Sequence, residues 1–426
     1  MPELRRKLLF TIGIILVYRF GAQIPVPYVN AEQLEGMFDS YSGTVLQYLN
    51  ILSGSAFSRA TLLALSISPY ITSSIVMQLL CVAIPALERM SKEDDGREKI
   101  QKITRFVTVG LSVITAIGYY VYLNSSHLIT PPKDMPGWFV AVVMIACYSA
   151  GGAIVMWLGE KINERGVGNG ISMILFANIV SSGPGVALGL YNLFTQWGWN
   201  TALAVIGLVL GIAMIVFMVF VSESERRLPV QYAKRVVGRK MYGGQSTNLP
   251  MKLNMAGVMP IIFANSIVAI PSTIAVMLGH SNDQKGFWYV FLKIFNVTSF
   301  GYLAIYLILL FLFAYFYIAI SFNPVEVANN LKKNGGFIPG IRPGRPTVEY
   351  ITKILSRITF IGAAFLAIIS GLPLLINCIS HLVGFDGLSS IAFGGSSLLI
   401  VVGVALETAR DIEGQMTMRH FKGFLE

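Results

Sequence analysis

Ten long apolar runs limit what this 426-residue chain can fold into more than any other feature. A membrane-spanning helix needs about 20 mainly apolar residues, and most of the runs are close to that length. Only 13% of the residues are charged, against roughly 25% in a typical soluble domain. We therefore expect an all-α polytopic membrane protein. The runs cover approximately residues 8–24, 62–84, 105–123, 138–158, 171–190, 201–221, 255–277, 302–322, 356–376 and 391–409.

The first run could be the core of a signal peptide, since it follows Arg5, Arg6 and Lys7. No small-residue cleavage site comes after it, so we expect it to remain as the first span. The three cysteines of the chain lie in or beside apolar runs, with no CxxC or Cys/His spacing. No disulfide framework and no metal site are expected from them.

Basic residues gather on one side of the predicted spans. The N-terminus, the even-numbered connections and the C-terminus hold 27 of the 32 Lys and Arg residues, whereas the opposite side holds four. The remaining one, Arg19, lies within the first span. By the positive-inside rule, we predict a protein of the plasma (inner) membrane whose two termini lie in the cytoplasm. An even number of spans agrees with this orientation.

The ten runs divide into two sets of five. Five precede about residue 197 and five follow it, and an odd number per half reverses the orientation of the second half. Inverted repeats of this kind often enclose a path at their interface. We expect two inverted halves, 1–197 and 198–426, on the span count alone, because the halves show no visible similarity residue by residue.

The predicted spans carry little reactive chemistry. Their charged residues Glu160, Glu223, Glu407 and Arg410 fall near the predicted cytoplasmic ends, and no acid or His lies near a span centre. Such central residues usually mark proton or ion relays, so a proton-coupled transporter is disfavoured. The chain also lacks a phosphate-binding loop, an HExxH motif and a dinucleotide fingerprint. We expect no catalytic activity and no cofactor.

Polar residues inside the spans are mostly small and are typical of packing between helices. Gln78 and Asn265 are larger, and their amides need hydrogen-bonding partners or water. They could meet across a helix seam that opens. Between the first two spans, the polar stretch from Ser53 to Thr61 is too short to cross a bilayer. It is either an external loop or a short re-entrant piece, and a re-entrant piece needs a surrounding cavity or protein.

Two predicted cytoplasmic connections, 223–254 and 323–357, are longer than a tie between helices requires. Connections of this length are usually functional. Pro and Gly in GGFIPGIRPGRP predict a shaped protrusion that presents Arg342 and Arg345. Attraction to anionic lipid suffices for the flanking lysines, whereas the Arg342 fork suits a carboxylate or phosphate of a protein or RNA partner. The basic residues proposed for partner docking are Arg342, Arg345, Lys332, Lys333, Arg235, Arg239 and Lys240.

Four stretches of the chain resemble the SecY family, the channel subunits of the Sec protein translocon (SecY / Sec61-alpha). They are NPVEVANNLKKNGGFIPGIRPG, QSTNLPMKLNMAGVMPIIFANSI, WLGEKINERGVGNGISMILFANI and FGGSSLLIVVGVALET. The resemblance runs from the first span to the last, in the same order and with the same ten-span layout. It implies two inverted five-helix halves around a central hourglass pore that a short plug helix fills from outside.

The resemblance also implies roles for individual residues. The plug corresponds to about 50–62, and Gln78 and Asn265 fall on the walls of a lateral gate. Among the positions implied for an apolar pore ring, 67 with 71 and 175 with 179 are i, i+4 pairs on one helix face. Leu175 stands where relatives often have Ile, which keeps the position apolar. The implied pore ring is Ile67, Ile71, Leu175, Ile179, Ile262 and Ile400. The plug residues are Ser53, Gly54, Ser55, Ala56, Phe57, Ser58 and Arg59.

The family's activity would make this chain a protein-conducting channel. It would pass unfolded, signal-sequence-bearing polypeptides across the plasma membrane and release hydrophobic segments sideways into the lipid bilayer. The implied partners are the membrane subunits SecE and SecG and, as the source of energy, the SecA ATPase or a ribosome. The alternative is a secondary transporter of small solutes, which predicts a compact polar binding site. A structural scaffold would leave the basic loops without a docking partner.

Overall fold

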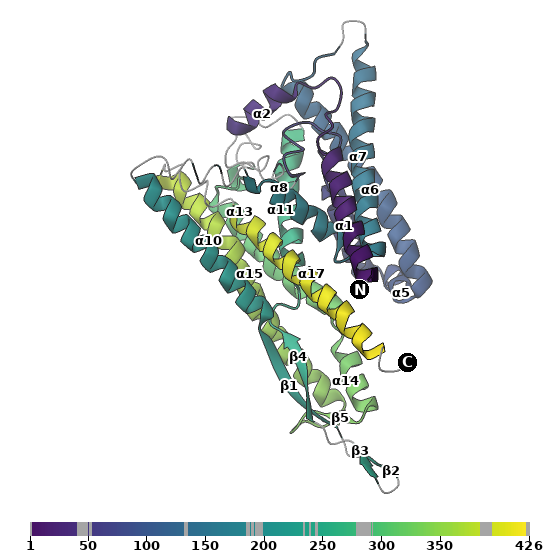
Figure 1. Cartoon of the computed structure of the whole chain (residues 1–426). Helices are drawn as coiled ribbons and strands as arrows, with labels where there is room; N and C mark the ends of the chain where they lie inside the picture. Colours follow the sequence, from purple (N-terminus) through teal and green to yellow (C-terminus); the bar gives the residue numbers. More distant parts are fainter. Residues whose placement is uncertain are drawn as a thin grey trace.

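The computed structural model describes residues 2–40, 53–131, 135–184, 199–232, 235–237, 240–242, 246–277, 293–383 and 394–422, with the single residues 50, 188, 191 and 291. Helices dominate these residues, as predicted. In Figure 1, α1, α5, α6 and α7 form a group at the right and α10, α13, α15 and α17 a group at the left, with α8 and α11 between them. The two central helices therefore join the groups.

A helix overlaps each of the ten predicted runs. Three further helices are α2 (Ala31–Ser40), α5 (Pro85–Lys92) and α14 (Pro324–Lys333). Most of the ten helices that overlap the predicted runs differ from the predicted limits at one end or both. They are α1 (Pro2–Gly21), α4 (Ser68–Ala83), α6 (Asp94–Ser125), α7 (Gly137–Arg165), α8 (Gly170–Ser181), α10 (Trp199–Glu223), α11 (Met259–Met277), α13 (Phe300–Ser321), α15 (Arg345–Val383) and α17 (Gly394–Lys422).

The structure differs from the expectation of ten full spans. Among the described residues, five helices are long and apolar enough to cross a membrane, or six if the bent pair α4 and α5 counts as one. The α8 helix has 12 residues, and α1 and α17 carry several charged side chains. The other predicted runs lie in helices that do not meet this length and composition within the described residues, and the helical multi-pass class of fold is as predicted. The five are Gly96–Ser125, Gly137–Arg165, Val205–Glu223, Phe300–Lys333 and Arg345–Ile379.

Local sequence explains where several helices begin and end. The α4 helix begins only at Ser68, because residues 62–67 form turns. Ile84 is extended before Pro85, as the residue before a proline tends to be, and α5 leaves α4 at 109°. The side chain of Asn169 accepts a hydrogen bond from the Ile171 amide at 3.0 Å and so caps α8.

Close packing holds α8 against α7. A Cβ placed on Gly170 would lie 2.0 Å from the Gly159 carbonyl oxygen, so no larger residue fits there without moving a backbone. Neighbouring pairs α6 and α7, α4 and α6, α11 and α13, and α13 and α15 also contact each other. The central helix α11 reaches α4 and α6 on the other side. One buried apolar cluster extends through this centre.

Two small sheets add to the predicted all-α fold. Strand β1 (Glu225–Tyr232) pairs antiparallel with β4 (Ser246–Lys252) on one side and with β5 (Gly336–Phe337) on the other. A separate hairpin joins β2 (Arg235–Val237) to β3 (Lys240–Tyr242). These strands lie beyond one end of α10 and α15 in Figure 1. The three-stranded sheet therefore unites the two long connections.

Candidate pore and plug

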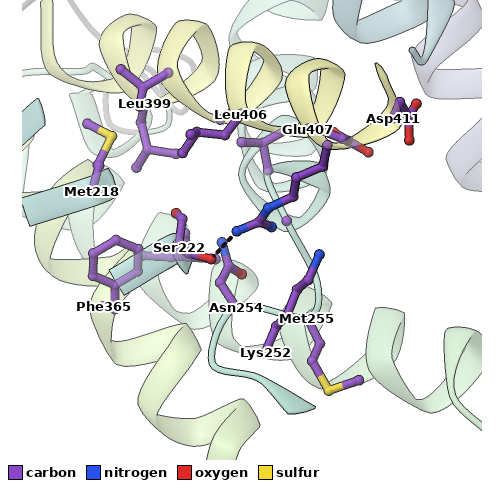
Figure 2. Close-up of a pocket in the computed structure, with 16 residues that line it drawn as sticks. Met218, Ser222, Lys252, Asn254, Met255, Phe365, Leu399, Leu406, Glu407 and Asp411 are labelled. Atoms are coloured by element: carbon purple, nitrogen blue, oxygen red, sulfur yellow. Dashed lines mark hydrogen bonds between the residues drawn. The ribbon is translucent and has the colours of Figure 1, made fainter. Parts of the chain in front are cut away.

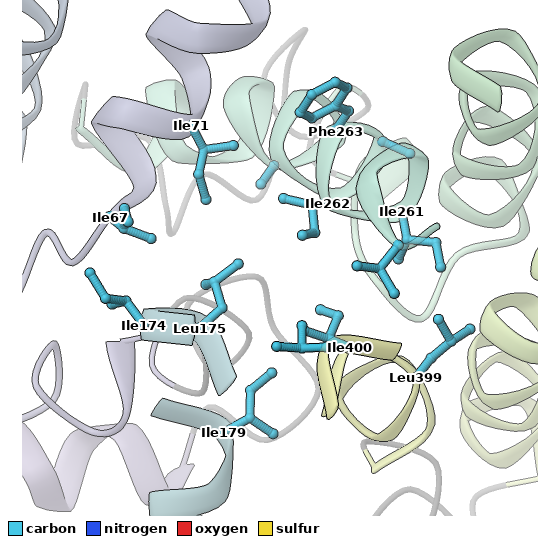
Figure 3. Close-up of a cluster of buried hydrophobic side chains, with 14 of the residues drawn as sticks. Ile67, Ile71, Ile174, Leu175, Ile179, Ile261, Ile262, Phe263, Leu399 and Ile400 are labelled. Atoms are coloured by element: carbon cyan, nitrogen blue, oxygen red, sulfur yellow. The ribbon is translucent and has the colours of Figure 1, made fainter. Parts of the chain in front are cut away.

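The six residues of the predicted ring come together at the centre of the molecule. Figure 3 shows Ile67, just before α4, and Ile71, Leu175, Ile262 and Ile400, on α4, α8, α11 and α17, directed toward a common region. Each of the six, Ile179 included, is at most 9% exposed, and all belong to the same buried apolar cluster. The structure thus juxtaposes residues that are more than 300 positions apart in the chain.

Other apolar residues surround these six. A Cβ on Gly159 of α7 would lie 3.5 Å from Ile67 Cδ1 and 3.6 Å from Ile174 Cδ1, so both side chains pack on that helix. Ile174, Ile261 and Leu399 belong to the same cluster, next to ring residues in the chain. Sequence reasoning did not single them out, because adjacent apolar residues in a span give no separate signal.

The predicted plug segment is compact but is not a continuous helix in the described residues. Ser53 is helical, and residues 54–60 form turns, which departs from the helix that the family resemblance implied. The positive φ angles of Gly54 (63°), Ser55 (66°) and Ala60 (47°) break a regular helix. Local bonds hold the turns: the Ser55 amide donates to the Asn50 carbonyl at 2.9 Å.

Side chains of the plug segment pack into two different apolar clusters. Ala56 is fully buried within the central cluster that contains the ring, whereas Phe57 lies in a second cluster with residues of α6 and α7. The Tyr119 hydroxyl donates to the Phe57 carbonyl at 2.7 Å, and the two rings lie 4.5 Å apart. Ser53, Gly54 and Ser58 are also buried, Ser55 is half-buried and Arg59 is exposed.

Arg59 connects the end of the plug segment to α2 and to Gln23. Its Nη2 lies 3.2 Å from Glu35 Oε1 on α2, and its Nη1 donates to Gln23 Oε1 at 3.4 Å. Both charged side chains are nearly half exposed, and exposed pairs contribute about 0–1 kcal/mol. The buried contacts of Ala56 and Phe57 therefore account for more of the segment's position.

The structure places Gln78 and Asn265 on the contacting helices α4 and α11 but does not join them. Gln78 Nε2 donates to Ser74 Oγ on its own helix at 3.3 Å. Asn265 is 4% exposed, and its Nδ2 has no hydrogen-bond partner in the part of the chain that the structure describes. A buried amide group without a hydrogen-bond partner is unfavourable, so it weakens the packing around Asn265.

The described docking residues lie in the two long connections and at helix ends. Arg342 is exposed at a turn that the Thr347 hydroxyl fixes by donating to the Arg342 carbonyl at 2.9 Å. Arg345 begins α15 with its side chain 92% exposed, 3.5 Å from Glu349. Lys332 and Lys333 are exposed in the last turn of α14. The backbones of Arg235 and Lys240 lie in the β2–β3 hairpin, and Arg239 lies outside the described residues.

A cavity of about 290 Å³ opens between α10, α15 and α17, and sequence reasoning did not foresee it. Figure 2 shows its mixed lining, with Met218 and Phe365 opposite Lys252 and Glu407. Arg410 in its wall donates to the Ser222 carbonyl and to Glu223 Oε1. Among the described residues, no group of three His, Cys, Asp or Glu side chains could hold a metal ion.

Comparison with known proteins identifies the family. The model of the SecY family matches residues 61–409. The chain belongs to the SecY family. A curated SecY relative, the protein translocase subunit SecY of Streptomyces coelicolor, is 43% identical over 442 residues, which cover 100% of this chain and 97% of that protein. The subunit of Mycobacterium bovis is 40% identical over 438 residues, with the same coverage.

Solved structures with the SecY fold agree. One described as "The structure of a protein conducting channel" has a TM-score of 0.69 at 16% identity and covers 97% of this chain and 93% of its own. A second, of Sec61 in a canine ribosome-channel complex, has a TM-score of 0.64 at 15% identity, with the same coverage. These likenesses confirm the predicted class of fold, a multi-pass helical membrane protein.

Proposed function

We propose that this chain is the channel subunit of a Sec translocon, which passes unfolded polypeptides across a membrane and releases hydrophobic segments sideways into lipid. Membership of the SecY family supports this function. The observation that carries the gating mechanism is the buried meeting of Ile67, Ile71, Leu175, Ile179, Ile262 and Ile400 from four helices. We propose that these residues form the constriction of an hourglass pore between the halves 1–197 and 198–426.

An apolar ring suits a substrate that can be any unfolded protein. Specific hydrogen bonds cannot recognise every sequence, whereas a narrow apolar constriction makes few directional contacts and excludes water and ions by dewetting. Branched side chains can close around a moving chain. The segment from Ser53 to Arg59 completes the seal in the resting state, since its Ala56 packs in the same cluster as the ring.

Sideways release needs a seam between helices that can open. We propose that α4 and α6 form one side of this lateral gate and α11 and α13 the other. Contacts of α11 with both α4 and α6 close the seam in this structure. Gln78 and Asn265 lie on its walls in this proposal. Asn265 Nδ2, which has no partner among the described residues, lowers the cost of separation.

Energy for translocation comes from partners in this proposal, because the proposed mechanism contains no catalytic step. The docking site is the exposed Arg342 turn with Arg345, Lys332 and Lys333, beside the basic β2–β3 hairpin. A SecA ATPase or a ribosome would bind there, and SecE and SecG would surround the channel. A structure of a yeast Ssh1 complex bound to a ribosome is among the chain's structural neighbours, which supports a ribosome as partner.

We further propose a plasma membrane location with both termini in the cytoplasm. The distribution of basic residues supports this orientation. Lys7 Nζ at the start of α1 donates to Gln415 Oε1 near the end of α17 at 3.2 Å, so the two ends of the chain lie on the same side. No observation favours the alternative of a small-solute transporter.

The test is ATP-dependent import of a signal-sequence-bearing protein into vesicles that contain this chain, SecE, SecG and added SecA. Arg342→Glu should abolish import while the protein remains folded, because charge reversal repels an acidic docking surface. Lys353→Glu, which reverses an exposed charge on α15 away from the turn, is the matched control. Normal import by Arg342→Glu would refute the docking assignment, and absence of import by the unmodified chain would refute the function.

A further inference from the structure

A small polar network lies between the plug segment and the ring. Arg19 Nη1 at the end of α1 donates to Asn178 Oδ1 on α8 at 3.4 Å. Asn178 Nδ2 in turn donates to Ser66 Oγ at 3.2 Å, and the Tyr18 hydroxyl lies 3.4 Å from the same oxygen. Asn178 and Tyr18 are fully buried and Ser66 is 2% exposed. The network therefore joins three separate parts of the chain inside the protein.

Two members of this network directly precede ring residues. Ser66 is followed by Ile67, and Asn178 by Ile179. The Asn178–Ser66 hydrogen bond thus connects the α4 side of the ring to the α8 side. If the ring widens between these two helices, the distance between Ser66 and Asn178 must increase and this bond must break.

The plug segment rests on the same network through Gly54. A Cβ placed on Gly54 would lie 2.5 Å from Arg19 Nη1, and 3.0 Å from both Asn178 Oδ1 and Ser181 Oγ. Its φ of +63° is also one that other residues rarely adopt. Glycine at this position lets the plug backbone approach Arg19 and Asn178 directly.

Arg19 is an unusual residue for this place. It lies inside the first predicted span, and charged residues within the membrane are costly and commonly functional. This was the sequence signal that could have indicated the network. Its bond to Asn178 could not be inferred, because that residue lies 159 positions further along the chain.

We propose that Arg19, Asn178 and Ser66 form a polar seat that couples the plug to the ring. When the ring is closed, the Asn178–Ser66 bond keeps the seat intact and Gly54 packs on it. When the ring widens, the bond breaks, the seat separates and the plug is released. Ring opening and plug release are then a single event. This inference rests on the proposed channel function and concerns its regulation.

The test measures ion conductance of the purified channel complex in planar bilayers without substrate. Asn178→Ala removes the side-chain hydrogen bonds to Arg19 and Ser66. It should raise the closed-state conductance about tenfold, since loss of a buried partner favours the opened state. Asn178→Asp keeps an acceptor for both Arg19 and the Ser66 hydroxyl, so it should restore closure. Equal leak from the two variants would overturn the proposal.

Gly54→Ala provides a second, independent variant. Its Cβ meets Arg19 and Asn178, so this variant should also leak. Gly257→Ala is the matched control, because Gly257 has a φ of +62° and no heavy atom lies within 4 Å of the position that a Cβ would occupy there. Combining Gly54→Ala with Arg19→Ala should leak no more than Arg19→Ala alone, since both act on one seat. Additive leaks, or equal leak from Gly257→Ala, would contradict the coupling.

The measurements distinguish failure of the polar seat from failure of the channel function. Import of a signal-sequence-bearing protein by the unmodified complex tests the channel function under the same conditions. If that complex imports protein and Asn178→Ala does not leak, the seat is refuted and the channel stands. If the unmodified complex imports nothing, the channel function is refuted.

Discussion

Tyr119→Phe should loosen the plug segment without removing its aromatic packing. The Tyr119 hydroxyl donates to the Phe57 carbonyl at 2.7 Å, and Tyr119 is 2% exposed. The variant removes this donor, while the Ala60 amide still donates to the same carbonyl at 3.2 Å. Water can replace the lost donor once the plug has moved. Loss of one hydrogen bond at an acceptor that keeps another donor costs about 0.5–1.5 kcal/mol, which corresponds to about 2- to 13-fold in an equilibrium constant.

The assay is the mean conductance of the substrate-free channel complex, which should rise by a factor in that range. The ring contact between Phe57 and Tyr119, at 4.5 Å between centroids, is kept in the variant. Tyr120→Phe on the same helix is the control, because the Tyr120 hydroxyl bonds to no described residue. Conductance unchanged from that of Tyr120→Phe would show that the Phe57 carbonyl bond does not retain the plug.

Three further predictions concern the ring, the gate and the helix packing. Ile262→Ser should raise ion conductance during translocation while protein import continues, because a hydroxyl in the ring favours water; unchanged conductance would count against the ring. Gln78→Leu and Asn265→Leu should each shift how hydrophobic a signal sequence must be for import, and unchanged selectivity in both would remove them from the gate. Gly170→Ala places a Cβ 2.0 Å from a backbone oxygen of α7 and should cost about 1–3 kcal/mol, measured as a lower thermal unfolding temperature in detergent, whereas Gly211→Ala, with open space around it, should not lower it.

Hydropathy predicted the existence of the helices well, because apolar runs of this length have few alternatives in a bilayer. It did not predict their lengths. The α4 helix is shortened by turns before Ser68 and by Pro85 after it, and these depend on the packing of the preceding segment. Limits based on apolar content cannot register such effects.

The three-stranded sheet was not predicted, since β1 and β5 are about 100 residues apart and pair only in the folded chain. A signal for β1 was nonetheless present. Leu228 and Val230 are both 2% exposed while their neighbours face outward, which is the alternation typical of a half-buried strand. The two prolines of the pairing, Pro229 and Pro250, obscured it.

The ring residues could be named only through the family resemblance, aided by their i, i+4 spacing. Composition treats Ile67 like any other apolar residue of a span. What distinguishes it is its position opposite Ile262 and Ile400, and that is a property of tertiary structure. The contacts of Arg19 could not be predicted from the sequence for the same reason.

The sheet that unites the connections 223–254 and 323–357 also has a mechanical consequence. Residues 253–258 alone separate β4 from α11, the helix that carries Ile262. A partner that tilts the sheet therefore pulls on the start of α11, and the paired strands share the load with the segment that carries Arg342. Force applied to the sheet is thus transmitted to Ile262 along one continuous stretch of backbone.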